Sequence, residues 1–227
     1  MRLNSVRLVA AGLAALACAL PATASTNISA TNKYTWGENV GWLNWRDANL
    51  TTDGAHVGCL FLQGFVWGEN IGWVNLGDGS PANSVAYANL NGTDFGVNVD
   101  AVGNLSGFAW SENCGWINFS GGALATPGQP ARVDLTTRRL RGYAWGENIG
   151  WINLDDSTHY AALNPACAGD ANFDGVVDFD DITQVLASWA AGYTPAGCDG
   201  AGDANLDGVV DFDDITEVIA NWNVVCP

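Results

Sequence analysis

Two segments near the C-terminus, residues 170–181 and 203–214, repeat one pattern of oxygen-bearing side chains. Within each segment, carboxylates or amides occupy positions 1, 3, 5, 9 and 12, and glycine occupies position 6. A hard divalent cation prefers oxygen ligands, and the glycine permits the sharp turn that folds these oxygens inward. The pattern therefore predicts metal chemistry, with one calcium ion in each segment and two ions in all.

The predicted ligands of each segment are five side chains and the backbone carbonyl at position 7. This is the ligand set of an EF-hand loop, with Asp in place of Glu at position 12. The ligands are Asp170, Asn172, Asp174, Val176, Asp178 and Asp181 in the first segment, and Asp203, Asn205, Asp207, Val209, Asp211 and Asp214 in the second. Four carboxylates in one short loop repel one another unless a cation lies between them. An acidic turn without metal is the alternative, but two matches in register favour metal binding.

The charge of the chain is concentrated in the same region. The 227 residues include 24 Asp and Glu against 8 Lys and Arg, which gives a formal net charge of −16. Residues 167–227 hold twelve of these acids and no Lys or Arg. A chain this acidic, without a basic patch, is a poor partner for nucleic acid or for an anionic membrane surface.

An amphipathic helix is predicted directly after each acidic segment, because apolar residues recur there at i, i+3, i+4 and i+7. These residues are Ile182, Val185, Leu186 and Trp189, and then Ile215, Val218, Ile219 and Trp222. No helix is predicted before either segment. Duplicated units of an acidic loop and an exit helix resemble the dockerin module, and the resemblance covers residues 166–227.

The resemblance implies a small α-helical domain that folds around two calcium ions and docks onto a cohesin module. Dockerins attach secreted proteins of polysaccharide degradation to a scaffold or cell surface. In that family, loop positions 10 and 11 contact cohesin. The corresponding residues here are Phe179, Asp180, Phe212 and Asp213. Many family members carry small hydroxyl residues at these positions, so the partner is either a divergent cohesin or none. The alternative for the two phenylalanines is that they are core residues.

The N-terminus has the features of a signal peptide over residues 1–24. Arg2 and Arg7 precede an apolar stretch at residues 8–20, and a small-x-small cleavage site follows this stretch at residues 22–24. A lipoprotein acylated at Cys18 is the alternative. Export predicts a secreted or cell-surface location in an oxidising compartment.

Five cysteines follow the predicted signal peptide, and they are Cys59, Cys114, Cys167, Cys198 and Cys226. The odd number leaves at least one thiol outside an intramolecular disulfide. Cys167 and Cys226 bracket the dockerin-like segment, so a disulfide between them would join its ends. Pairing of Cys198 with Cys226 is the competing possibility.

A second family of repeats lies within residues 25–165, which are predicted to form a mainly β repeat domain ahead of the small α-helical one. Four units carry the motif Trp-Gly-Glu-Asn-x-Gly-Trp or a close variant, at residues 34–45, 65–76, 108–119 and 143–154. Each unit predicts a hairpin, and further strands at residues 95–100 and 131–135 predict three-stranded meanders. Because one hairpin cannot bury its apolar face alone, the units are expected to pack as a propeller, a sandwich or a stack.

The faces of the hairpins follow from the length of the turn. A four-residue loop at residues 147–150 would pair Trp145 with Ile152, which buries the first tryptophan of each motif and leaves the second on the opposite face. The second tryptophans are Trp42, Trp73, Trp116 and Trp151. Beside asparagine and glutamate they could stack on sugar rings, so they are candidate glycan-binding residues. The alternative is that each covers its own turn or packs on the next unit.

Catalysis has weaker support than binding. A glycosidase needs two carboxylates with different protonation states, whereas the turn glutamates Glu38, Glu69, Glu112 and Glu147 are equivalent. The only adjacent acids of the β region are Asp155 and Asp156. We therefore predict a secreted, non-catalytic calcium-binding protein. Its dockerin-like domain is expected to tether a β-repeat module to a cohesin or cell-surface partner. Carbohydrate binding is one role for the β-repeat module. A glycan hydrolase that carries a dockerin and a structural cell-surface protein are the alternatives.

Overall fold

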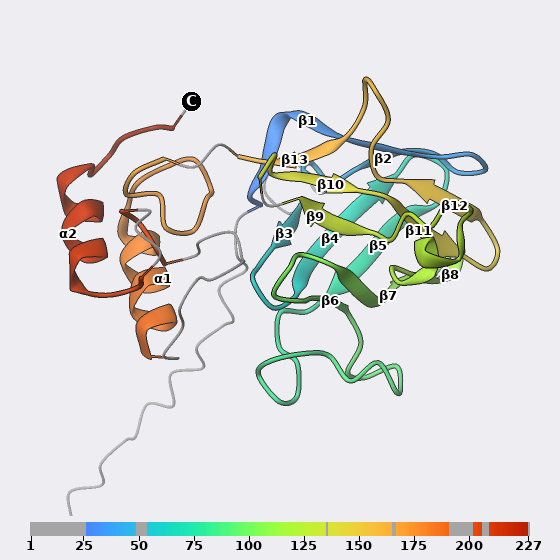
Figure 1. Cartoon of the computed structure of the whole chain (residues 1–227), viewed down its shortest axis with the longest axis horizontal. Coiled ribbons are helices and arrows are strands. Elements are labelled where there is room, and N and C mark those ends of the chain that lie inside the picture. Colours follow the sequence, from blue (N-terminus) through green and yellow to red (C-terminus); the bar gives the residue numbers. More distant parts are fainter. Residues whose placement is uncertain are drawn as a thin grey trace, which may run out of the picture.

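The computed structural model describes residues 26–48, 54–134, 136–164, 167–190, 202–205 and 209–226. The chain is mainly β, as predicted, with two short helices, α1 (Phe179–Ala190) and α2 (Phe212–Ala220). The two helices lie together at one side of the β-rich body (Figure 1). The predicted signal peptide at residues 1–24 lies outside the described residues, and so do Cys198 and Asp207.

Eight strands form a closed antiparallel barrel built from four consecutive hairpins. The hairpins are β1 (Ile28–Gly37) with β2 (Gly41–Asn44), β4 (Leu62–Gly68) with β5 (Gly72–Gly77), β7 (Leu105–Ser111) with β8 (Gly115–Asn118), and β11 (Tyr143–Gly146) with β12 (Gly150–Asn153). Neighbouring hairpins pair through β2 and β4, β5 and β7, and β8 and β11. Pairing of Trp36 with Asn153, between β1 and β12, closes the ring. Closure leaves no free edge in the eight-stranded ring, and the arrangement is none of the three that we expected.

Shorter strands pair outside this ring. β3 (Ala55–Val57) pairs with β4, β6 (Val97–Val99) pairs with β7, and β9 (Arg132–Asp134) pairs with β10 (Arg139–Arg141). β6 and β9 lie within the two segments where additional strands were predicted. β13 (Ala161–Leu163) pairs with β1, and the backbone N–H of Asn164 donates to the carbonyl of Asn27 at 2.8 Å. The two ends of the β region are therefore joined to each other by hydrogen bonds.

The hairpin register differs from the prediction by one residue. Trp145 pairs with Trp151 and Gly146 pairs with Gly150, which leaves three residues in the loop instead of four. The other hairpins show the same register, with Trp36 opposite Trp42, Trp67 opposite Trp73, and Trp110 opposite Trp116. Because side chains alternate between the two faces of a strand, a one-residue change moves the first tryptophan of each motif from the interior to the outer surface. The predicted apolar face was therefore wrong for the first strand of each hairpin.

The barrel interior alternates small and large side chains. In three hairpins the first strand contributes a small residue and the second strand contributes a larger one opposite it, whereas in the second hairpin valine faces valine. The pairs are Thr35 with Leu43, Val66 with Val74, Ala109 with Ile117, and Ala144 with Ile152, and all are at most 3 % exposed. Trp45 reaches Phe119 across the interior at 6.3 Å between ring centroids, and its Nε1 donates to Thr35 Oγ1 at 2.9 Å. This alternation fills a barrel of eight strands without leaving a channel.

Candidate functional site

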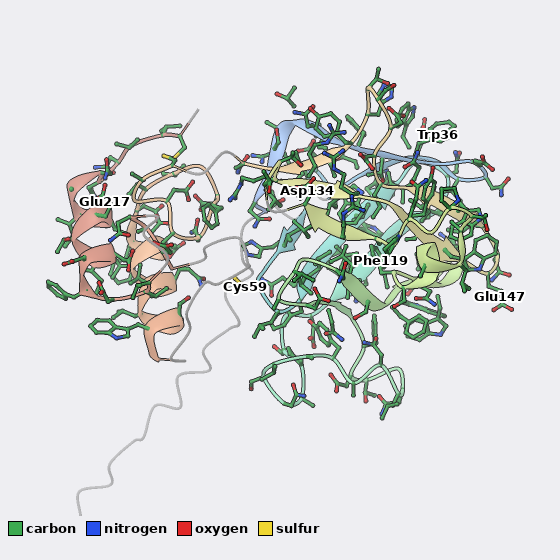
Figure 2. All side chains as sticks on the ribbon, viewed as in Figure 1. Trp36, Cys59, Phe119, Asp134, Glu147 and Glu217 are labelled. Carbon is green, nitrogen blue, oxygen red and sulfur yellow. A yellow bond between two sulfur atoms is a disulfide. The ribbon has the colours of Figure 1, made fainter. Side chains whose placement is uncertain are left out.

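The repeated turns have a structural role at one end of the barrel. Glu147 marks the tip of the β-rich body that lies farthest from the helices (Figure 2). The variable residue of each turn is buried, and these residues are Val40, Ile71, Cys114 and Ile149, at 2–6 % exposure. In three turns a glycine faces the variable residue, and a Cβ added at that glycine would overlap with it, as at Gly68 with Ile71. In the third turn Ser111 replaces the glycine, and the smaller Cys114 replaces the aliphatic residue.

A ring of hydrogen bonds joins the four turns. The side-chain amide of each turn asparagine donates to the backbone carbonyl of the variable residue in a neighbouring turn. The pairs are Asn70 with Val40 at 3.1 Å, Asn113 with Ile71 at 2.9 Å, Asn148 with Cys114 at 3.0 Å, and Asn39 with Ile149 at 3.0 Å. The last pair closes the ring between the first and fourth turns. The asparagine of the motif is therefore architectural, whereas the glutamate beside it is exposed in all four turns.

The asparagine two positions after each second tryptophan is also engaged locally. Its Oδ1 accepts a hydrogen bond from the backbone N–H two residues later. The pairs are Asn44 with Arg46, Asn75 with Gly77, Asn118 with Ser120, and Asn153 with Asp155. Such Asx turns let the chain leave the strand. The amide oxygens of these asparagines are therefore already used within the fold.

Eight tryptophans form four cross-strand pairs on the outer wall of the barrel. Ring centroids are 4.7 Å apart in Trp36–Trp42, Trp110–Trp116 and Trp145–Trp151, and 5.0 Å apart in Trp67–Trp73. Of the four candidate glycan-binding tryptophans, Trp73 and Trp116 are 41 % and 40 % exposed, whereas Trp42 and Trp151 are half-buried. The first tryptophans of the motifs, which we had assigned to the interior, contribute as much exposed surface at Trp36, Trp67 and Trp145.

Two grooves lie between neighbouring hairpins on this wall. The Tyr34 groove has a volume of about 400 Å³ and is lined by Tyr34, Trp42, Asn44, Trp67, Glu69 and His159. The Phe108 groove has a volume of about 460 Å³ and is lined by Asn89, Leu90, Asn91, Gly92, Phe95, Phe108, Trp116 and Glu147. Each groove combines aromatic surface with a few polar groups, as ligand sites do. Trp42 and Trp116 line these grooves, and Trp73 and Trp151 do not.

In the acidic segments, the first and last carboxylates are buried. Asp170 and Asp203 at position 1, and Asp181 and Asp214 at position 12, are at most 5 % exposed. Each position-12 carboxylate accepts hydrogen bonds from the backbone N–H groups at positions 3 and 9 of its own segment. The donors are Asn172 and Asp178 for Asp181, and Asn205 and Asp211 for Asp214. The two segments thus share these hydrogen bonds to the carboxylate at position 12.

Asp170 has a buried oxygen atom without a hydrogen-bond donor. Its Oδ2 accepts from the backbone N–H of Gly175 at 3.1 Å, whereas Oδ1 has no partner among the described residues. Burial, followed by the negative charges of Asp181 and Asp174, raises the pKa of Asp170 to about 7. Burial is also the main cause that raises the pKa of Asp181 to about 6. A hard cation would satisfy the free oxygen and offset the repulsion, so this set of oxygen donors fits calcium.

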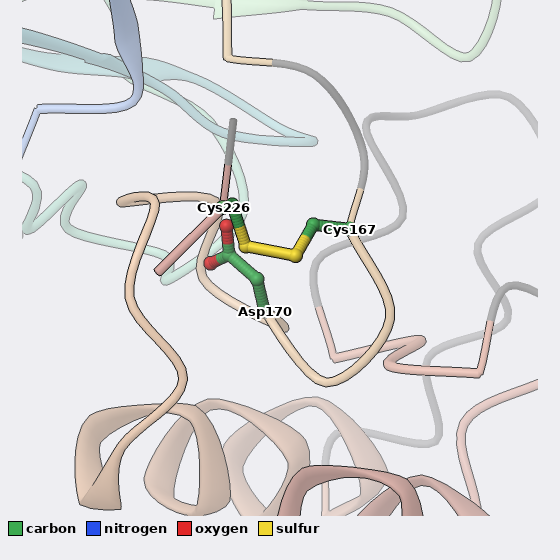
Figure 3. A group of neighbouring side chains, drawn as sticks. All are labelled: Cys167, Asp170 and Cys226. Atoms are coloured by element: carbon green, nitrogen blue, oxygen red, sulfur yellow. A yellow bond between two sulfur atoms is a disulfide. The ribbon is translucent and has the colours of Figure 1, made fainter. Parts of the chain in front are cut away.

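A disulfide joins Cys167 to Cys226 beside Asp170 (Figure 3). The two sulfur atoms and a carboxylate oxygen of Asp170 lie within 4.8 Å of one another. This trio is not itself a metal site, because a cysteine ligates a metal as a thiolate and these sulfur atoms are bonded to each other. Among the residues that the structure describes, no three carboxylates come within the same distance. The acidic side chains of the first loop are therefore more widely spread than this trio.

The candidate partner-binding residues are exposed. Phe179 and Phe212 are 64 % and 61 % exposed, and Asp180 and Asp213 beside them are also exposed, so the alternative that the phenylalanines are core residues is wrong. Val185 and Val218 are fully buried between the helices and their loops. The outer members of the predicted apolar faces, Leu186, Trp189, Ile219 and Trp222, are 42–59 % exposed. Half of each amphipathic face is therefore accessible.

The adjacent acids Asp155 and Asp156 have separate structural partners. Asp155 Oδ2 forms an ion pair with Arg141 Nη1 at 2.7 Å. Asp156 Oδ1 accepts the backbone N–H groups of Thr158 and His159, and these hydrogen bonds hold the pKa of Asp156 at about 2. A general acid requires a raised pKa, so this pair does not supply the acid and base of a glycosidase.

Trp67 and His159 are groove residues that the sequence analysis missed. The assumed loop length placed Trp67 in the interior, although the glycines that flank its turn, Gly68 and Gly72, were a signal for the shorter loop. His159 follows the last repeat, and only the closed barrel brings its ring to 4.6 Å from that of Trp42.

No helix in the described part of the chain is long and apolar enough to cross a membrane. No protein-family model, curated protein or solved structure matches the chain.

Proposed function

We propose that the chain is an exported, non-catalytic, calcium-binding protein that acts in polysaccharide degradation. Its C-terminal segment, residues 166–227, acts as a dockerin-type module and tethers the protein to a cohesin or another cell-surface partner. The β region, residues 25–165, is the cargo of this module, and carbohydrate binding is its proposed role. Calcium would neutralise charge and fix the shape of the two loops, and it would take no part in a reaction.

The observation that carries the proposal is the buried Oδ1 of Asp170, which has no hydrogen-bond partner among the residues that the structure describes. A buried acceptor left without a partner costs about 1–3 kcal/mol, and more when the group is charged. A calcium ion removes this cost at the position where the sequence pattern expects its first ligand. Two such ions would also bring the formal charge of residues 167–227, which hold twelve acids and no Lys or Arg, from −12 to −8.

The residues that would hold the ions are the ones at the repeated loop positions. In the first loop they are Asp170, Asn172, Asp174, Asp178 and Asp181 with the carbonyl of Val176. Asp181 already accepts two backbone N–H groups, which orients its carboxylate at the end of the loop. The second loop repeats these hydrogen bonds at Asp214, which supports two equivalent ions rather than one.

The exposed phenylalanines support a tether in preference to a purely structural role. Phe179 and Phe212 begin α1 and α2 and leave most of their ring surface in solvent. Exposed aromatic side chains at equivalent places are typical anchors of protein interfaces. A structural surface protein makes no use of this duplicated surface. A hydrolase is also disfavoured, because Asp155 and Asp156 are engaged separately and each groove is lined by a single carboxylate, where a glycosidase needs two.

Thermal unfolding of the full chain with calcium and with a chelator tests the metal sites. We expect calcium to raise the melting temperature of the C-terminal transition and titration calorimetry to give two ions per chain. Asp170→Asn should reduce this effect. Asp180→Asn is the matched control, because Asp180 is an exposed carboxylate of the same loop that is not a predicted ligand. Identical melting with and without calcium contradicts the proposal.

Binding to immobilised cohesin modules tests the tether. We expect binding in calcium, loss of binding in chelator, and little change for Phe179→Ser or Phe212→Ser alone, because the two loops offer duplicate surfaces. The double variant should lose binding. A chain that binds two calcium ions and yet binds no cohesin would support the structural role instead.

A further inference from the structure

We propose that the Tyr34 groove and the Phe108 groove are two binding sites for neutral sugar residues, so that one barrel engages two stretches of oligosaccharide. The inference specifies the ligand and the number of sites for the carbohydrate-binding role proposed above, and it rests on that role. It does not depend on the calcium loops. The grooves are therefore testable separately from the tether.

The two grooves share three positions of the repeat and differ in the rest of their lining. The first aromatic residue of one hairpin and its second tryptophan form one side, and they are Tyr34 with Trp42 or Phe108 with Trp116. The turn glutamate of the following hairpin completes each groove, and it is Glu69 or Glu147. One groove thus spans the first and second hairpins, and the other spans the third and fourth. In a closed ring of four hairpins these two seams lie on opposite sides of the barrel.

Aromatic rings in both grooves are accessible and held in place. Tyr34, Trp67 and Trp116 are 39–40 % exposed. A second ring braces the inner tryptophan of each groove from a separate segment, with His159 at 4.6 Å from Trp42 and Phe95 at 5.1 Å from Trp116, between ring centroids. Rigid, partly exposed rings offer flat apolar faces that carry partial negative charge, which suits the C–H groups on one face of a pyranose.

The polar groups of the grooves suit hydroxyl groups. The carboxylates of Glu69 and Glu147 form no hydrogen bond or ion pair with the residues that the structure describes, so their oxygens are left as acceptors for a ligand. A sugar hydroxyl can donate to such a carboxylate while its ring packs on the neighbouring tryptophan. Apolar stacking together with a few hydrogen-bond acceptors is the combination that recognises a polyhydroxylated ring.

The charge of the grooves selects against anionic ligands. No Lys or Arg lines either groove, each contains a carboxylate, and the whole chain carries −16. The imidazole of His159 lies beside Asp156, with Nδ1 at 3.3 Å from Oδ2, so it adds no unbalanced positive charge. Uronic acids and sulfated sugars would be repelled. Neutral hexose or N-acetylated sugar chains are therefore the ligands that these grooves fit.

Isothermal titration of the full chain in calcium tests the proposal with cellohexaose, xylohexaose, mannohexaose and chitohexaose. We expect one of these probes to bind with two sites per chain, and hexagalacturonate not to bind. Trp67→Ala should leave one site, Trp116→Ala should leave one site, and the double variant should bind at least about tenfold more weakly. Trp145→Ala is the matched control, because Trp145 is a paired and exposed tryptophan that lines neither groove.

A second pair of variants guards against loss of folding in the tryptophan variants. Glu69→Gln with Glu147→Gln changes exposed side chains and should weaken binding of the same probe, whereas Glu112→Gln should not. Binding of no neutral probe, binding that survives in both double variants, or binding of a lysine-rich peptide alone would overturn the proposal. Asp170→Asn should bind the oligosaccharide like the wild type, so failure of the calcium sites is distinguishable from failure of the grooves.

Discussion

The guanidinium carbon of Arg138 lies 4.5 Å from the ring centroid of Phe173, and this contact anchors the first acidic loop to the β region. Phe173 is fully buried at position 4 of that loop, and Arg138 precedes β10. The backbone carbonyl of Phe173 also accepts a hydrogen bond from Asn164 Nδ2 at 3.0 Å, and the carbonyl of Asn164 accepts from Arg138 Nε at 2.9 Å. The loop that is proposed to bind calcium is therefore attached directly to the β region.

Removal of the Phe173 ring should destabilise this attachment. Phe173→Ala deletes a fully buried aromatic side chain, and we expect a loss of about 3–5 kcal/mol in the free energy of unfolding. Phe179→Ala is the control, because Phe179 is 64 % exposed and its change should stay within about 0.5 kcal/mol. Urea denaturation followed by tryptophan fluorescence measures both. Equal effects of the two variants would show that Phe173 is not an anchor.

The turn pairs Gly68–Ile71 and Ser111–Cys114 predict a compensating double substitution. A Cβ at position 68 would overlap with Ile71 Cγ1, so Gly68→Ser should cost about 1–3 kcal/mol through overpacking. Ile71→Cys alone should cost a similar amount through the cavity that it leaves. The double variant reproduces the third turn of the same barrel, and it should be more stable than the sum of the single effects predicts.

A double-mutant cycle on the four proteins measures this coupling by chemical denaturation. We expect a favourable interaction energy of at least about 0.5 kcal/mol between the two substitutions, as contacting residues show. Simple additivity would mean that the two positions do not pack on each other. Gly92→Ser is a control for the serine itself, because a Cβ there meets nothing within 4 Å.

The hydrogen-bond ring at the turns predicts a specific role for its asparagines. Asn113→Ala removes the 2.9 Å hydrogen bond to the carbonyl of Ile71, and we expect a loss of about 1 kcal/mol in unfolding free energy. Glu112→Ala, at the neighbouring exposed position, should have an effect within about 0.5 kcal/mol. Thermal and urea unfolding can distinguish the two. A larger effect at Glu112 than at Asn113 would contradict the ring as a source of stability.

Tyr87 supplies a prediction about pH. It is 4 % exposed and its hydroxyl accepts the backbone N–H of Gly79 at 2.7 Å, in the loop that continues into the Phe108 groove. Burial raises the pKa of Tyr87 from 10.0 to about 12, with a smaller contribution from the charge of Asp78 and an opposing one from the Gly79 hydrogen bond. Because the folded-state pKa exceeds the unfolded one, the associated stability is complete below pH 10 and is lost as the pH rises through about 12.

Ultraviolet absorbance during alkaline titration tests this pKa. Subtracting the curve of Tyr87→Phe from that of the wild type isolates one of the five tyrosines of the chain. We expect a difference curve with its midpoint near pH 12. A midpoint near pH 10 would mean that the Tyr87 hydroxyl is solvated and that the loop is not held by it.

The sequence by itself determined the features that depend on neighbouring residues. Alternating apolar residues around glycine-rich turns predicted a mainly β chain, and the apolar spacing after the two acidic segments predicted two short helices. Val185 and Val218, both assigned to the apolar faces of these helices, are buried. Local spacing is sufficient here because a helix or a hairpin joins residues that are close in the chain.

Only the tertiary structure decided the closure of the barrel, the hairpin register and the two grooves. Closure depends on pairing of Trp36 with Asn153, more than a hundred residues apart, which no local pattern encodes. The register was ambiguous because both faces of the first strand of each hairpin carry apolar residues, such as Ala144 and Trp145, so a one-residue shift leaves the alternation intact. The grooves form where one hairpin pairs with the next, as Asn44 does with Trp67, and this pairing joins residues from separate repeats. For this reason the sequence identified the chemistry of the groove residues, but not which of these residues lie together.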